Sequence, residues 1–257
     1  MPDKRHALPI CRTRPACPGQ TGRVSSDILN LPTESGDLPV HRWLPSSGTG
    51  PGVLVLQEIF GVSAYVRSRA SDLAEAGYVV FAPELYHRLP DAQVGEDDLA
   101  KGMELAGQLP WDEALADART AMDALRAAPE SGGRVGLLGF CYGGGLAFNL
   151  AAQTVPDALV SYYGSALPTL LPLAREVTCP SLHHFGTADD YIPLEIVEKI
   201  RSAVTSGNRR VQFFTYDGAG HAFDNPSPMF HHEQASALAW QRTLTFLAAH
   251  LGRAGQA

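Results

Sequence analysis

Three residue types that together form a nucleophilic catalytic group occur in this sequence in the order cysteine, aspartate, histidine. Cys141 lies in the segment Gly-Phe-Cys-Tyr-Gly-Gly, with one glycine two positions before it and another two positions after it. This spacing is typical of a nucleophile elbow, a tight strand–turn–helix junction with no room for side chains at those two positions. Asp189 and His221 follow further along, where a histidine could take the thiol proton and an aspartate could orient the imidazole.

Other interpretations of these residues stay open at this point. A dinucleotide-binding Gly-x-Gly-x-x-Gly loop would need glycine at position 141, whereas a buried structural cysteine is a stronger alternative because free cysteine is often buried. Asp190 competes with Asp189 for the role of the acid, and Asp189 could simply cap the helix that follows it. His221 could be an exposed loop residue. The shared order of nucleophile, acid and histidine favours the catalytic interpretation.

Short apolar segments alternate with helix-like segments along the chain, and this alternation predicts how the three residues are positioned. We expect a single-domain α/β-hydrolase fold, with a mostly parallel central sheet and helices on both faces. Each of the three residues then follows a strand, at the edge where α/β folds bind ligands. The expected strands are 28–31, 38–44, 53–56, 78–82, 135–138, 158–163, 181–185 and 211–216, and the expected helices are 65–76, 97–107, 112–127, 142–153, 194–204 and 233–250.

The composition changes at both ends of the chain. Residues 1–23 hold five basic residues against one acid among four prolines, without the apolar core of a secretory signal, and we expect a disordered or extended basic arm there. We assign 24–251 to the hydrolase domain and 252–257 to a C-terminal tail.

The overall composition excludes several function classes. The net charge of −7 argues against bulk binding of nucleic acid. No apolar run is long enough for a membrane span. The four cysteines (11, 17, 141 and 179) lack paired spacing, so we expect a cytoplasmic protein, monomeric or a small homo-oligomer. We expect no cofactor and no metal, since the adjacent histidines His183 and His184 would point to opposite faces of a strand.

Four segments together resemble the dienelactone hydrolase (carboxymethylenebutenolidase) family. They are Gln-Glu-Ile-Phe-Gly at 57–61, the cysteine segment at 139–144, Gly186 to Pro193, and Ala-Gly-His-Ala-Phe at 219–223, and the resemblance runs from about residue 28 to 250. It implies a cysteine-dependent hydrolase that opens a cyclic enol-lactone by acyl transfer to sulfur.

The resemblance also implies roles for individual residues. It selects Asp189 as the catalytic acid, because the family's aspartate stands four residues before the proline that matches Pro193. It gives Glu58 the task of helping to generate the thiolate when substrate arrives. The oxyanion hole would consist of the backbone N–H groups of Ile59 and Tyr142.

The residues expected to bind substrate include one departure from the family pattern. Arg88 matches one of two family arginines that hold a substrate carboxylate, but the position of the second is Asn225. An amide cannot replace a guanidinium without loss of charge pairing, so a neutral ester or lactone becomes more plausible. Phe60 and Phe223 are expected to line an apolar pocket near the strand ends; Tyr163 could do so too or pack in the core.

The function we expect is hydrolysis of a lactone or ester through a cysteine acyl-enzyme, with a small molecule as the partner. A general carboxylesterase or thioesterase acting on neutral esters is the first alternative. A thiol redox or binding protein without hydrolytic activity is the second. It is disfavoured because nothing in the sequence places a resolving cysteine at Cys141.

Overall fold

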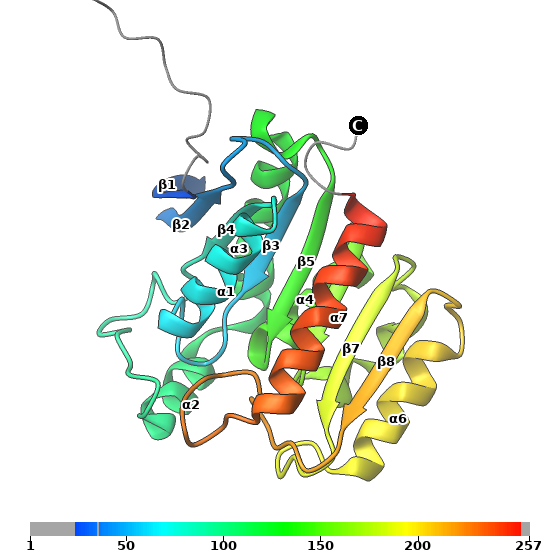
Figure 1. Cartoon of the computed structure of the whole chain (residues 1–257). Coiled ribbons are helices and arrows are strands. Elements are labelled where there is room, and N and C mark those ends of the chain that lie inside the picture. Colours follow the sequence, from blue (N-terminus) through cyan, green and yellow to red (C-terminus); the bar gives the residue numbers. More distant parts are fainter. Residues whose placement is uncertain (1–23, 35, 253–257) are drawn as a thin grey trace, which may run out of the picture.

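A computed structural model of the protein describes residues 24–34 and 36–252, so the predicted arm 1–23 and all but residue 252 of the predicted tail lie outside it. The described residues form one sheet of eight strands (Figure 1). The strands are β1 (Ser25–Thr33), β2 (Gly36–Leu44), β3 (Gly52–Leu56), β4 (Val79–Pro83), β5 (Val135–Phe140), β6 (Ala158–Tyr162), β7 (Ser181–Gly186) and β8 (Val211–Tyr216).

The order of the strands across the sheet is β1-β2-β4-β3-β5-β6-β7-β8. β1 and β2 form an antiparallel hairpin, β2 pairs antiparallel with β4, and all strands from β4 to β8 run parallel. Every residue of β3 to β7 is buried, whereas β8 is only partly buried. Continuous apolar strands are typical of a parallel sheet covered on both faces, and the predicted mostly parallel sheet is confirmed.

The long helices are α1 (Ala64–Glu75), α2 (Leu99–Gln108), α3 (Trp111–Ala127), α4 (Tyr142–Gln153), α6 (Leu194–Thr205) and α7 (Glu233–Leu251). α1 and α7 cover one face of the sheet, and α3 and α4 cover the other (Figure 1). The sequence prediction missed the short α5 (Leu167–Leu170) and the 3₁₀ turns 129–131 and 171–175. These elements span three to five residues, which is too short for hydrophobic periodicity to show.

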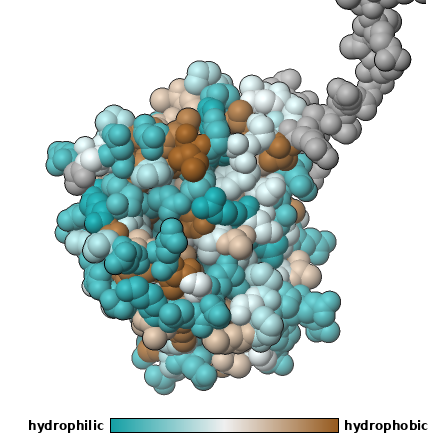
Figure 2. Space-filling model, turned by 90° about the vertical axis from the view of Figure 1, so that its left-hand side faces the viewer, coloured by the Kyte–Doolittle hydropathy of each residue, from teal (hydrophilic) through white to brown (hydrophobic). Residues whose placement is uncertain are grey.

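One side of the molecule is mainly hydrophilic (Figure 2). Figure 2 shows the left-hand side of Figure 1, where hydrophobic residues form small, separate patches among hydrophilic ones. Among the described residues, no helix has the length and apolar character needed to cross a membrane. The cytoplasmic location and the oligomeric state stay predictions.

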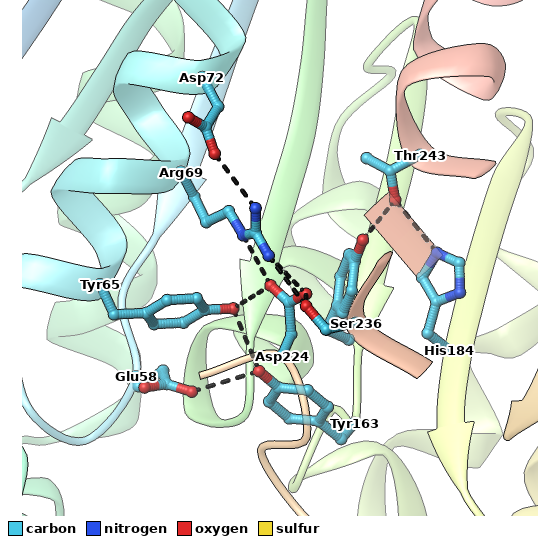
Figure 3. Close-up of polar contacts among 10 residues, drawn as sticks. Glu58, Tyr65, Arg69, Asp72, Tyr163, His184, Asp224, Ser236 and Thr243 are labelled. Atoms are coloured by element: carbon cyan, nitrogen blue, oxygen red, sulfur yellow. Dashed lines mark hydrogen bonds and ion pairs between the residues drawn. The ribbon is translucent and has the colours of Figure 1, made fainter. Parts of the chain in front are cut away.

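One buried ion pair ties together the elements on the α1–α7 face of the sheet. Arg69 of α1 donates two hydrogen bonds to Asp224, which lies between β8 and α7, at 2.8 and 2.7 Å (Figure 3). The hydroxyl of Ser236, on α7, donates to the same carboxylate at 2.7 Å. The guanidinium also lies over the ring of Trp240, 4.4 Å from its centroid. The Asp224 carboxylate therefore joins α1 to the loop before α7 and to α7 itself, across about 155 residues of sequence.

Replacement of Arg69 by methionine should destabilise the fold strongly, because it leaves Asp224 charged in a buried place. We expect the free energy of unfolding to fall by about 3–5 kcal/mol, as measured by urea denaturation. Lys101→Met is the control, since Lys101 forms an exposed pair with Glu104 whose loss should cost below about 0.5 kcal/mol. Equal losses in the two variants would contradict the role of the buried pair.

Candidate active site

The turn between β5 and α4 places Cys141 at its tip. The residue has φ 51° and ψ −112°, a backbone conformation that is strained for a side chain other than glycine. Its amide donates to the carbonyl oxygen of Tyr162 at 3.0 Å, which ties the turn to β6. A Cβ atom at Gly139 would overlap the carbonyl oxygen of Gly143, and one at Gly143 would overlap that of Leu56. The glycines predicted from the elbow spacing are thus sterically required.

His221 lies between Cys141 and Asp189, as the roles expected for the three residues require. Its Nε2 is 3.1 Å from the Cys141 sulfur, and its Nδ1 is 2.8 Å from Oδ2 of Asp189. The other oxygen of Asp189 accepts from the backbone amides of Tyr191 and Ile192 at 2.8 and 2.9 Å. The structure places Asp189 in this position and leaves Asp190 exposed.

Electrostatics favour a positively charged imidazole at this site. Burial disfavours the charged ring, but negative charge on the Cys141 sulfur and hydrogen bonding to Asp189 outweigh it and raise the pKa of His221 to about 10. Cys141 also precedes the first residue of α4, so the positive end of that helix dipole faces the sulfur. The arrangement suits an imidazolium beside a thiolate.

Glu58 lies just past β3 and is almost completely buried, with 1% of its surface exposed. Asn225 donates its amide to Oε2 at 3.0 Å, and the hydroxyl of Tyr163 lies 3.4 Å from Oε1. Burial raises the pKa of Glu58 to about 7, although the Asn225 hydrogen bond and the charge of His221 oppose the shift. Glu58 can therefore change its charge near neutral pH.

A cavity of about 330 Å³ opens beside Cys141, His221 and Glu58. The rest of its wall is mostly apolar. Besides those three residues it is lined by Ile59, Phe60, Leu99, Met103, Ala106, Gly107, Tyr142, Ser165, Tyr191, Ala222 and Phe230. None of these described lining residues is arginine or lysine. The cavity suits an apolar, uncharged group next to a reactive sulfur.

The predicted oxyanion-hole residues, Ile59 and Tyr142, both line this cavity. The amide of Tyr142 is the first of α4, and the first amides of a helix lack an intrahelical partner. No acceptor among the described residues takes up the Ile59 amide. Both N–H groups are therefore available to a ligand.

Two predicted substrate contacts lie elsewhere. Arg88 forms an ion pair with Asp117 of α3, with Nη2 2.7 Å from Oδ1, and borders a different hollow. Phe223 is fully buried and packs against the ring of Tyr163, with centroids 5.3 Å apart. The carboxylate of Asp117 draws the guanidinium to this other hollow, and Arg88 is not among the residues that line the cavity at Cys141. Phe60 does line the cavity, as predicted.

Sequence reasoning did not identify several residues that shape the site. Met103 and Gly107 line the cavity from α2, whose glycine at 102 lets the helix lie close to Ile59 and Phe60. Helix α2 was expected, and the spacing of its cavity-lining residues (99, 103, 106 and 107) follows one helix face. The sequence offers no means of distinguishing a helix face that lines a cavity from a helix face that packs in the core.

Comparison with known proteins identifies the family. A sequence profile of the dienelactone hydrolase family matches residues 40–251. The carboxymethylenebutenolidase of Pseudomonas putida is 35% identical over 212 residues, which cover 79% of this chain and 88% of that protein. Carboxymethylenebutenolidase 1 of Cupriavidus pinatubonensis is 31% identical, over 87% of this chain and 97% of the relative.

Solved structures agree on the fold. The crystal structure of a Klebsiella pneumoniae protein named after dienelactone hydrolase matches with a TM-score of 0.78 and 30% identity, covering 88% of this chain and 99% of that one. A dienelactone hydrolase-like phosphotriesterase from metagenomic libraries shares the fold at 23% identity, with a TM-score of 0.75. The predicted α/β-hydrolase fold is confirmed. The chain belongs to the dienelactone hydrolase family and is a carboxymethylenebutenolidase-like hydrolase.

Proposed function

We propose that this hydrolase cleaves neutral carboxylic esters or lactones through a thioester on Cys141. The observation that carries the proposal is the position of His221, 3.1 Å from the sulfur and 2.8 Å from Asp189. Such a histidine can hold a proton, donate it and take another, with its tautomer fixed by the carboxylate. The cavity supplies room for a small ester next to the sulfur.

In the proposed mechanism the Cys141 thiolate attacks the carbonyl carbon and the C=O π pair moves to oxygen. The backbone amides of Ile59 and Tyr142 donate hydrogen bonds to this oxyanion. When the C–O bond breaks, His221 gives its proton to the departing alkoxide. His221 then takes a proton from water, whose oxygen attacks the thioester and releases the carboxylic acid and the thiolate.

Glu58 would supply a second proton acceptor in the same cavity. Its carboxyl can be charged or uncharged near neutral pH, because its pKa is about 7. In this proposal the charged form takes the proton of Cys141 when the sulfur is in its thiol form, so that the nucleophile is generated with substrate present. Glu58 therefore acts as a proton acceptor only when the thiolate is generated, and His221 carries out the later proton transfers.

The nature of the cavity supports a neutral substrate. Arg88 pairs with Asp117, and the amide of Asn225 is bound to Glu58. Neither side chain therefore holds a carboxylate of the substrate at the sulfur. The cation that the described cavity wall does offer, the His221 imidazolium, is already held by Asp189 and the Cys141 sulfur. The carboxylate of an anionic lactone would therefore lie against an apolar wall or near Glu58, which is unfavourable without a partner.

Removal of the sulfur tests the reaction. We expect Cys141→Ala to lower kcat for p-nitrophenyl acetate by about 10⁴-fold or more, since no other group at the turn can form the acyl-enzyme. Cys179→Ala is the matched control, a second buried cysteine outside the cavity, and it should retain activity. Unchanged turnover in Cys141→Ala would exclude the mechanism. Reversible oxidation of Cys141 without any esterase activity would favour the thiol redox alternative.

A pair of substrates that differ only in charge tests the substrate class. We expect kcat/KM to be at least about tenfold higher for the methyl ester of a dienelactone than for the free carboxylate, because an unpaired charge in the cavity costs more than about 1.4 kcal/mol. Initial rates of ring opening on one enzyme preparation give the comparison. Equal or better use of the carboxylate would show that a cation reaches the substrate.

The size of the cavity can be tested at Gly107. A Cβ atom there meets nothing within 4 Å, and leucine raises helix propensity, so Gly107→Leu should fold normally while it narrows the cavity. We expect the ratio of kcat/KM for p-nitrophenyl octanoate to that for the acetate to fall about tenfold. Gln108→Leu, at the neighbouring position outside the cavity lining, should leave the ratio unchanged. A constant ratio in both variants would mean that acyl chains do not extend along α2.

A further inference from the structure

A row of buried hydroxyl groups connects Glu58 with the ion pair of Arg69 and Asp224 (Figure 3). The hydroxyl of Tyr163 lies 3.4 Å from Oε1 of Glu58 and 3.3 Å from the hydroxyl oxygen of Tyr65. The Tyr65 hydroxyl in turn donates to Oδ2 of Asp224 at 2.6 Å. The two tyrosines, Glu58 and Asp224 are each at most 2% exposed, so the hydroxyls depend on these partners.

The hydrogen bond between Tyr65 and Asp224, at one end of the row, can have only one donor. Asp224 accepts two hydrogen bonds from the Arg69 guanidinium, at 2.8 and 2.7 Å, and a carboxylate in such an ion pair can only accept. The short contact from Tyr65 must therefore be a donation by its hydroxyl. A hydroxyl has one proton, so toward Tyr163 the Tyr65 oxygen can only accept.

Tyr163 consequently has one hydroxyl proton and two acceptors. Both of its contacts are longer than a usual O–H···O hydrogen bond, as expected for a hydroxyl that stands between alternative partners. When Glu58 is charged, its carboxylate is the stronger acceptor. When Glu58 is protonated, Asn225 faces Oε2, so the acid proton lies on Oε1 and is donated to Tyr163, whose own proton turns to Tyr65.

We propose that Tyr163 is a positioning residue whose hydroxyl turns between Glu58 and Tyr65, and that the fixed Tyr65–Asp224 hydrogen bond thereby helps to set the charge of Glu58. No proton passes along the row. The proton that Glu58 gains or loses moves through the cavity, where Glu58 and Cys141 are both wall residues. The effect of the Glu58 charge on thiolate formation at Cys141 rests on the proposed function. The coupling between the Glu58 charge and the Tyr163–Tyr65 hydrogen bond does not.

Other ionisable groups surround Glu58 and the two tyrosines, and the two tyrosine variants chosen below leave them unchanged. His221, Asp224 and Glu96, from the loops that precede α7 and α2, act on Glu58. Cys141 acts on Tyr163, and Arg69 of α1 acts on Tyr65. The variants chosen below remove a single hydroxyl and no charge.

The two hydroxyl deletions should shift the pKa of Glu58 in opposite directions. Tyr163→Phe removes a donor that stabilises the carboxylate more than the acid, so the pKa should rise by about one unit. Tyr65→Phe removes the alternative acceptor, so the Tyr163 hydroxyl stays on the carboxylate and the pKa should fall. The pKa of Glu58 is measured by infrared difference spectroscopy across a pH titration, from the C=O band of the protonated carboxylic acid. The band is assigned to Glu58 by its loss in Glu58→Gln.

Tyr162→Phe is the matched control. Tyr162 is also fully buried, but its hydroxyl pairs with Thr243 at 2.7 Å, so this variant should leave the Glu58 titration in place. Shifts of the same sign in Tyr163→Phe and Tyr65→Phe, or no shift in either, would overturn the proposal. The titration does not measure catalytic turnover, and it is repeated in Cys141→Ala. Its outcome therefore does not depend on whether the proposed hydrolytic function is correct. If one of the two variants does not fold, the other still tests the proposal, because the direction of its pKa shift is predicted separately.

Discussion

The buried pair of Arg69 and Asp224 is the interaction on which both the fold and the site depend. Asp224 stands three residues after His221 and directly before Asn225, so the contact that fixes one loop to α1 and α7 also fixes two side chains of the site. His221 reaches Cys141, and Asn225 reaches Glu58, from the same anchored segment. A buried ion pair adds little net stability over an apolar pair of equal size. Its value here is geometric, because Asp224 accepts hydrogen bonds from Arg69 of α1 and Ser236 of α7 at the same time.

Two proton acceptors with different surroundings serve one sulfur. The imidazole of His221 is paired with a carboxylate that accepts three hydrogen bonds at most 2.9 Å long, which favours the positive ring. Glu58 is held by an amide and a hydroxyl, neither of which carries charge. A guanidinium in place of the Asn225 amide would favour the charged carboxylate strongly. The neutral partners instead leave Glu58 close to balance between its two forms, which suits a group that must both take up and release a proton.

Most of the fold and the central residues of the site could be predicted from the sequence. The alternation of apolar strands and amphipathic helices fixes the α/β class, and strand ends then bring Cys141, Asp189 and His221 to one edge. The residues alone left Asp189 and Asp190 open, and only the family resemblance selected Asp189, because the family's aspartate stands four residues before the proline that matches Pro193. Arg88 could not be placed, since the direction of a loop side chain follows no period and its partner Asp117 lies on a helix 29 residues away. The row of Tyr65 and Tyr163 could not be predicted either, because it forms only when the fold brings together two residues that are 98 positions apart in the sequence.

The distribution of charge around the sulfur narrows the chemistry further. Cys141, His221 and Glu58 reach the cavity from segments that follow strands, whereas α2 contributes only apolar residues and a glycine to its wall. In the proposed mechanism a substrate carbonyl faces the strand ends, where it meets the sulfur and the amides of Ile59 and Tyr142. The rest of the substrate then lies along α2, where a charged group would lose its water without gaining a partner. Burial also raises the pKa of Glu58, which lines the same cavity. Under this proposal, substrate preference and thiol activation therefore follow from one feature, the low polarity of the cavity.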